Sequence, residues 1–150
     1  MLFKYQAQIN ALHLTSIDCV CQVAQPRMQL AYRIASNPAA DPSNFIPRPL
    51  MPGVPARALA IPCDNPYKSQ READEDNLNA WGISLHENPD AARSLANRYK
   101  RAFTFATHIA ELNISPADGL CSTTDDHYHF NIHEELTANL GARVIKALPR

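Results

Sequence analysis

The sequence predicts a single α+β domain: a mainly antiparallel sheet of about six or seven strands, one clear helix packed on it, and a long proline-rich loop. Three observations predict this fold class. Several short segments alternate apolar and polar residues, as half-buried strands do. Residues 89–103 instead have the apolar spacing of an amphipathic helix. The length of 150 residues fits one domain over residues 1–150.

The overall composition argues against several classes of protein. A net charge of −1 gives no global support for nucleic-acid binding. No segment approaches the roughly 18 consecutive apolar residues of a membrane helix, and the first twenty residues lack the apolar core of a signal peptide. The cysteines include no Cys-x-x-Cys pair, and Cys19 and Cys21 are expected to act as small hydrophobic residues on a strand. We therefore expect a soluble protein of the reducing cytoplasm by default, with no membrane partner; secretion without a cleaved signal is the alternative.

The N-terminal third of the chain is expected to contribute three strands. Residues 3–9 and 17–23 each place apolar side chains at alternate positions, and Pro26 ends the second segment. The short connection around Pro26 predicts that the second and third strands form a hairpin or a corner. The third strand, residues 28–34, has an apolar face of Met28, Leu30, Tyr32 and Ile34 and an opposite face of Gln29, Ala31 and Arg33.

Residues 36–68 form the most distinctive loop. Eight of the twelve prolines lie between Pro38 and Pro66, and their fixed φ and missing N–H exclude a regular helix over most of this segment. Because a long loop in a compact domain is commonly functional, we expect an ordered excursion packed on the domain, with a short strand at 56–61. The acidic segment 69–79 is expected to be a short exposed helix or a solvated loop.

The second half of the chain begins with a strand over residues 81–85, followed by the helix over 89–103. Asn88 is expected to cap this helix, with Pro89 at its first position. Its buried stripe has members three or four residues apart: Ala92, Leu95, Ala96, Tyr99, Ala102 and Phe103. Further elements are expected in this order: a strand at 107–114, a turn at 115–119, strands at 120–123 and 127–133, a helical turn at 134–140 and a strand at 143–148.

The expected strand over residues 127–133 carries three of the six histidines. Alternation places Tyr128, Phe130 and Ile132 toward the core and the histidines toward the opposite side. Because neutral imidazoles two residues apart on a strand can bind one ion, His127 and His129 are a candidate metal pair. His133 lies about 13 Å beyond His129 at the rise of a strand. A solvated polar face is the alternative, and we expect no metal.

Glu134, Glu135 and Arg33 are candidates for acid–base chemistry and anion binding. The two glutamates are adjacent and point apart, so at most one of them enters a cleft. They also suit the start of a helical turn, where acidic residues complement the helix dipole. Arg33 lies in the middle of its strand, where a guanidinium can bind a phosphate or a carboxylate through two hydrogen bonds. An exposed arginine on the outer face of the sheet is the alternative.

The segment Trp81-Gly82-Ile83-Ser84 is a candidate binding wall. On a strand, Gly82 and Ser84 share a face of small side chains that lets a ligand or another backbone approach closely. A core tryptophan opposite small packing residues is the alternative. Ser84 lies in no Gly-x-Ser-x-Gly elbow, so the local sequence does not support a serine hydrolase.

In their order along the chain, these segments resemble the small bacterial ADP-ribosyltransferases. That family uses an arginine on an early strand to bind the phosphates of NAD, a serine block that runs into an alanine-rich helix, and a late glutamate that orients the ribose. Here Tyr32-Arg33-Ile34 resembles the first block, and Trp81-Gly82-Ile83-Ser84 with Ala91-Ala92 resembles the second. Glu134 or Glu135 resembles the third, and a single Ser84 stands where the family has a Ser-Thr-Ser triplet.

The resemblance implies an NAD-using transferase that acts as an effector or toxin, with NAD as its substrate. It implies that Arg33 binds the pyrophosphate, that Trp81, Gly82 and Ser84 shape the nicotinamide pocket, and that Glu135, or Glu134, stabilises the ribose cation.

Two other functions fit the sequence. A non-catalytic interaction protein, such as an immunity protein, antitoxin or adaptor, would contact a protein partner through the 38–66 loop. A metal-dependent hydrolase would use His127 and His129 as ligands.

Overall fold

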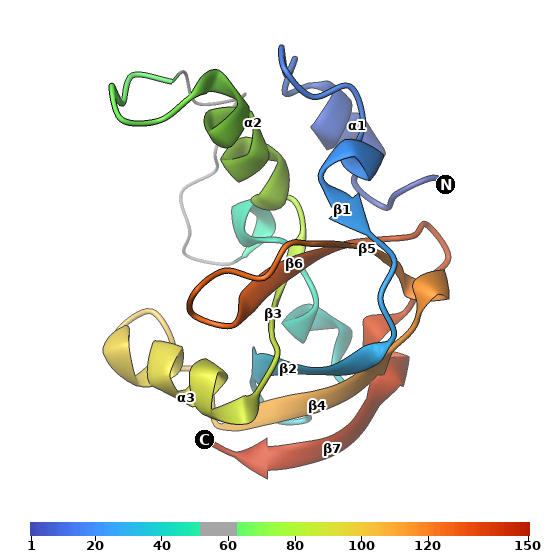
Figure 1. Ribbon diagram of the computed structural model, residues 1–150. Helices are drawn as coiled ribbons and strands as arrows, with labels where there is room; N and C mark the ends of the chain where they lie inside the picture. The colour runs from blue at the N-terminus through green and yellow to red at the C-terminus, as the bar shows by residue number, and fades with distance from the viewer. Residues whose placement is uncertain (52–62) are drawn as a thin grey trace.

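The computed structural model describes residues 1–51 and 63–150. Within them, seven strands form one antiparallel sheet in the order β1-β5-β6-β3-β2-β4-β7, which confirms the predicted fold class (Figure 1). The strands are β1 (Ala24–Gln25), β2 (Gln29–Ala35), β3 (Ile83–His86), β4 (His108–Ile114), β5 (Gly119–Ser122), β6 (His129–Glu134) and β7 (Val144–Pro149). The α-helices are α1 (Gln6–Asn10), α2 (Gln70–Asn79) and α3 (Pro89–Arg98). Short 3-10 turns are η1 (Val20–Gln22), η2 (Pro42–Asn44), η3 (Arg48–Leu50), η4 (Pro116–Asp118) and η5 (Leu140–Arg143).

The two faces of the sheet have different covers. One face buries the largest apolar cluster beneath Phe45 and Leu140, with fully buried strand residues that include Ile83, Leu85, Phe130 and Ile132. On the other face, Ala92 and Ala96 of α3 pack on β2 and β4. The N-terminal segment and the end of α2 form a third cluster around Leu78 and Leu120, near β5 (Figure 1).

The capping signals of α2 and α3 explain where these helices start. Ser69 and Glu72 form a capping box, so the acidic segment 69–79 is a helix and not a solvated loop. Asn88 accepts a hydrogen bond from the N–H of Ala91, with Pro89 at the first helical position, as predicted.

The predicted end of α3 was wrong by several residues. The helix ends at Arg98, and residues 99–105 continue as turns. Arg150 gives the physical reason, since its guanidinium donates hydrogen bonds to the carbonyls of Ala96, Phe103 and Ala106 at 2.8, 2.7 and 2.9 Å. These carbonyls are satisfied without a longer helix. Tyr99, which the periodicity placed in the buried stripe, is exposed.

The two N-terminal strands predicted at 3–9 and 17–23 are absent from the structure. The first segment contains α1 and a single bridge between Phe3 and Glu135, and the second contains η1. Phe3, Ile9 and Ile17 of these segments pack in the cluster around Leu78, whereas Cys19 and Cys21 are exposed, so the alternation reflects neither strand pairing nor uniform burial. β1 pairs with β5 and not with β2, so the chain makes a corner at Pro26.

Two further sequence predictions were wrong. Cys19 and Cys21 are exposed and joined by a disulfide, which corrects their expected role as small hydrophobic residues. The helical turn expected at 134–140 was misplaced, because Glu134 still belongs to β6 and the turn is η5.

The proline-rich loop is described over residues 36–51 and 63–68; the first part packs on the domain as expected, whereas residues 64–67 of the second are exposed. Asn44 holds the first part, since the side chain of Asn44 bonds the backbone of Ser36, Pro38 and Ala39. The strand expected at 56–61 lies outside the described residues.

Candidate functional site

The centre of the sheet carries a strip of polar side chains on β3 and β6. These strands pair with Ser84 opposite Asn131 and with His86 opposite His129. Because paired residues of antiparallel strands share a face, these four side chains lie on one side of the sheet. Tyr32 pairs with His86 and packs beneath α3, so this is the face that α3 covers further along the sheet.

Ser84, His129 and Asp125 form a chain of polar contacts within this strip. The hydroxyl oxygen of Ser84 lies 2.8 Å from Nε2 of His129, and Nδ1 of His129 lies 3.4 Å from a carboxylate oxygen of Asp125. The other carboxylate oxygen accepts hydrogen bonds from the N–H groups of His127 and His129 at 2.8 and 3.0 Å. The turn before β6 therefore fixes the carboxylate beside the imidazole.

The environment of His129 keeps its imidazole neutral near pH 7. Burial lowers the pKa of His129, and the neighbouring Asp125 opposes this only in part. The ring of His86 lies 5.4 Å away between centroids, and burial lowers the pKa of His86 to about 4. Burial raises the pKa of Asp125, but the backbone N–H groups of His129 and His127 outweigh that effect and leave it lowered. A neutral imidazole thus lies between a hydroxyl and a carboxylate.

Arg33 lies on the opposite face of the sheet and is almost fully buried. Its Nε donates to the carbonyl of Asn44 at 2.9 Å, and its Nη1 donates to the carbonyl of Ser84 at 2.7 Å. Burial lowers its pKa to about 10, so it remains charged near pH 7. β2 and β3 share a single paired position, Tyr32 with His86. Arg33 therefore helps to hold this weakly paired joint together.

The two candidate glutamates have different partners, both away from Ser84. A carboxylate oxygen of Glu134 lies 2.9 Å from Nζ of Lys4, and the N–H of Leu140 donates to the same oxygen at 3.4 Å. Burial raises the pKa of Glu134, and Lys4 opposes this. Glu135 instead accepts hydrogen bonds from the hydroxyl and the N–H of Thr137, which lower its pKa.

The structure brings Arg33 and Ser84 together but not the glutamates. The guanidinium reaches Ser84 through its backbone carbonyl, whereas the hydroxyl of Ser84 faces His129. Glu134 lies three residues beyond the partner of Ser84 on β6, on the order of 10 Å along the strand. As the sequence suggested, the two glutamates point apart.

Trp81 and Gly82 have structural contacts that account for both residues. Trp81 lies in the turn after α2, before β3 begins, and packs near the ring of Tyr5 at 6.2 Å between centroids. A Cβ on Gly82 would lie 2.9 Å from Cβ of Asn131 and 3.4 Å from Cε1 of His133. Side chains of β6 therefore fill the space beside Gly82, where the sequence predicted that a ligand or another backbone could approach closely.

The histidines of this region do not form a metal cluster. His127 is exposed in the turn before β6, so it is not at an alternate strand position with His129. His133 is buried, with Nε2 at 3.3 Å from the side-chain oxygen of Asn79, and burial lowers its pKa to about 4. Across residues 1–51 and 63–150, no group of three or more His, Cys, Asp or Glu side chains is placed to hold a metal ion.

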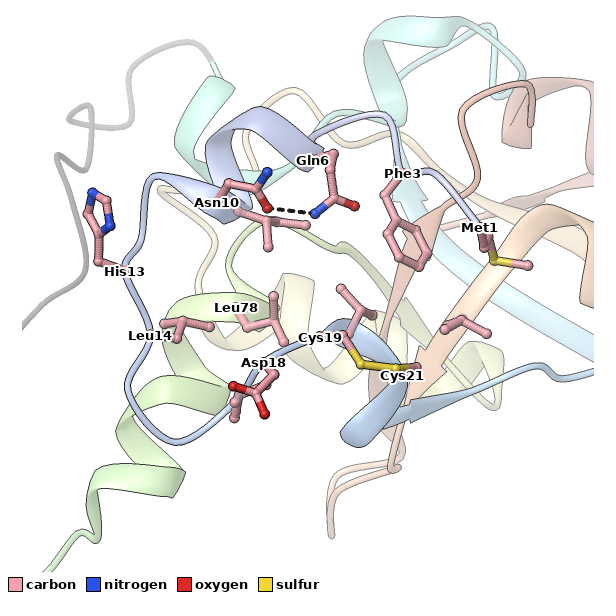
Figure 2. A pocket seen from close by; sticks show the side chains of 14 residues that line it. Met1, Phe3, Gln6, Asn10, His13, Leu14, Asp18, Cys19, Cys21 and Leu78 are labelled. Carbon is pink, nitrogen blue, oxygen red and sulfur yellow. Dashed lines mark hydrogen bonds between the residues drawn. A yellow bond between two sulfur atoms is a disulfide. The ribbon is translucent and has the colours of Figure 1, made fainter.

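A cavity of about 480 Å³ lies apart from this strip, within the N-terminal segment (Figure 2). Phe3 and Leu78 contribute to its apolar lining, and the Cys19–Cys21 disulfide lies at its wall. A hydrogen bond of 2.8 Å joins the side chains of Gln6 and Asn10, which also line it. None of Ser84, His129 and Asp125 lines this cavity. No motif in the sequence marked this cavity, whose lining comes mainly from residues 1–21.

Comparison with known proteins found no family model, curated protein or solved structure that matches this chain. In the described part of the chain, no helix has the length and apolar character needed to cross a membrane.

Sequence reasoning missed two residues of the polar strip, Asp125 and His86. Asp125 lies just before the expected strand at 127–133, but nothing in the local sequence shows that its carboxylate faces an imidazole. The absence of a local serine motif also concealed the contact between Ser84 and His129, since the two residues lie 45 positions apart.

Proposed function

We propose that the protein is an ADP-ribosyltransferase-like enzyme with NAD as its substrate, acting as an effector or toxin. One observation carries this proposal: the three blocks of the resemblance lie on three neighbouring strands, β6, β3 and β2. Arg33 is in β2, Ser84 is in β3, and β6 ends in Glu134. The alanine-rich helix α3 follows β3 directly.

The joint between β2 and β3 is the favoured position for the nucleotide. The two strands share a single paired position, so the sheet is least tightly joined there. The buried guanidinium of Arg33 lies at this joint and supplies positive charge toward a pyrophosphate. A direct contact with the pyrophosphate requires Arg33 to release the carbonyl of Asn44. Opening of residues 36–51 is therefore part of this proposal.

Release of nicotinamide from NAD tests the transferase function. We expect release by the intact protein, and a loss of about 100-fold or more in Glu135→Gln or Glu134→Gln, depending on which carboxylate stabilises the ribose cation. Arg33→Lys keeps the charge but loses the forked hydrogen bonds, so it should weaken NAD binding. Lys100→Met, a change at an exposed position in the turn after α3, is the control.

The proposal fails if no nicotinamide is released and calorimetry detects no NAD binding. Contact with a protein partner through the 38–66 loop and a cytoplasmic location remain predictions. The Cys19–Cys21 disulfide bears on the second of these, because disulfides are rare in reducing compartments. Rapid alkylation of thiols in intact cells, followed by mass spectrometry, measures whether the pair is oxidised where the protein resides.

A further inference from the structure

The polar strip contains the parts of an activated nucleophile. The hydroxyl of Ser84 contacts Nε2 of His129 at 2.8 Å, and Nδ1 of the same ring faces Asp125 at 3.4 Å. Nucleophile, base and orienting carboxylate stand in this order in serine hydrolases of unrelated folds, which are recognised by geometry and not by sequence position. We propose that Ser84, His129 and Asp125 form a catalytic triad that transfers acyl groups from small carboxylic esters to water, an activity that does not involve NAD.

The tautomer of His129 follows from its two neighbours. The carboxylate of Asp125 only accepts hydrogen bonds, so the ring nitrogen that faces it carries the proton. Nε2 is then the free acceptor, and the Ser84 hydroxyl donates to it. The second oxygen of Asp125 is held by two backbone N–H groups, so the carboxylate is fixed before a substrate arrives.

The charges around His129 favour its role as a base. The ionisable groups that influence it are His86 on β3, Asp125 in the preceding turn and Arg33 on the far side of the sheet. His86 is neutral near pH 7, so it does not oppose protonation of its neighbour strongly. Asp125 stabilises the imidazolium that forms when His129 takes the serine proton.

The site is reachable by a small substrate. Ser84 and His129 are both partly exposed, and Asp125 lies in an exposed turn. A partly exposed position of this kind suits a small uncharged ester better than a large or highly charged substrate.

The reaction balances without a further reagent. The oxygen of Ser84 attacks the ester carbonyl carbon, and its proton passes to Nε2 of His129. The bond between the carbonyl carbon and the alcohol oxygen breaks, and the alcohol leaves with the proton from His129. Water then attacks the acyl-serine and gives a proton to His129. The carboxylic acid departs, and Ser84 regains its proton.

A fluorophosphonate probe on the intact folded protein tests the nucleophile. The triad predicts one label per chain, located on Ser84 by peptide mass spectrometry. The label should be absent from Ser84→Ala and from heat-denatured protein, since only the folded site activates the hydroxyl. Ser94→Ala, which changes an exposed serine of α3, is the matched control and should label like the unmodified protein.

Hydrolysis of p-nitrophenyl acetate tests the base and the orienting carboxylate. We expect the rate to fall about 100-fold or more in His129→Gln and about 10-fold or more in Asp125→Asn. In the unmodified protein the rate should rise with pH as His129 loses its proton. Thermal unfolding of each variant shows whether the fold survives the change.

Several results overturn the triad. It is wrong if folded protein takes up no probe, if the label lies elsewhere, or if Ser84→Ala hydrolyses the ester at the unmodified rate. Full activity in a folded His129→Gln variant also refutes it. Nicotinamide release is measured on the same preparations, so failure of the transferase function and failure of the triad are seen separately.

Discussion

The two ends of β6 carry the same kinds of side chain in opposite surroundings. At its start, His129 is partly exposed and contacts Ser84 and the exposed Asp125. At its end, His133 is 1% exposed and Glu134 is 3% exposed. His129 and Asp125 have access to solvent, whereas His133 and Glu134 are enclosed. Burial, and not residue type, therefore distinguishes the end of β6 that we propose acts in catalysis from the end that stabilises the fold.

The cover at the far end of β6 comes from the N-terminal segment and from β5. Phe3 bridges to Glu135, and the N–H of Lys4 donates to the carbonyl of Glu134 at 3.1 Å. Gly119 of β5 lies against the backbone of His133 and Glu134. If burial distinguishes the two ends, substitutions at the enclosed end should mainly lower the free energy of unfolding. Substitutions at the open end should mainly lower the rate of the proposed reaction.

The largest expected loss of stability is that of Gly119→Ala. Gly119 has φ of 146°, and a Cβ there would lie 2.1 Å from the carbonyl oxygen of His133. The backbone of β6 would have to move, so we expect a loss of about 4 kcal/mol or more, or failure to fold. Urea unfolding measures this. Ala117→Gly, in the exposed turn just before it, is the control and should cost about 1 kcal/mol or less.

The next effect is the pH dependence that His133 imposes. Burial lowers its pKa from 6.5 to about 4, so the folded state holds the ring neutral while the unfolded chain protonates it. The contribution to stability is complete above pH 6.5 and is lost as the pH falls toward 4. The loss is on the order of 3 kcal/mol. Urea unfolding at pH 7, 5.5 and 4.5 should show it.

His133→Gln sharpens this test, because it removes the titrating ring and should flatten the stability profile between pH 6.5 and 4. His86 is buried with a similarly lowered pKa, so part of the slope should remain. An unchanged slope in His133→Gln would show that the enclosed end is not the source of the pH dependence.

Lys4→Met should have a smaller effect, about 2 kcal/mol at pH 7, because it leaves the buried carboxylate of Glu134 without its cation. Burial already raises the pKa of Glu134, and loss of Lys4 raises it further. A raised pKa makes the folded state relatively more stable when the carboxyl is protonated, so the deficit should shrink as the pH falls through the folded pKa. Lys100→Met, an exposed change, is the control. A deficit that stays constant with pH contradicts this account.

Sequence reasoning predicted the elements whose signals are local. Asn88 and Pro89 determine the start of α3. Alternation correctly placed Phe130 and Ile132 in the core, but it wrongly placed Tyr128 there, which precedes β6 and is exposed. Sequence reasoning failed where distant residues decide the structure. Arg150 satisfies carbonyls at the end of α3 and in the turns that follow it, and apolar residues of the N-terminal segment pack around Leu78 without forming the predicted strands.

The candidate site, too, could be predicted only where its signals are local. The sequence identified Ser84 and His129 individually, but their contact depends on the register between β3 and β6. It could not show that Glu134 is enclosed, because the cover comes from Lys4, 130 residues away. Partners that are distant in sequence leave no periodic signal. Neither the contact between Ser84 and His129 nor the burial of Glu134 could therefore be predicted from residue spacing.

The smallest expected loss of stability is that of His129→Gln, and it is the most informative. His129 is partly exposed, and a glutamine can still accept the hydrogen bond from Ser84, so we expect a cost within about 1 kcal/mol. The amide cannot act as a base, so probe labelling and ester hydrolysis should be lost while urea unfolding remains nearly normal. If His129→Gln instead costs as much stability as His133→Gln, both ends of β6 are structural and the proposed difference between them does not exist.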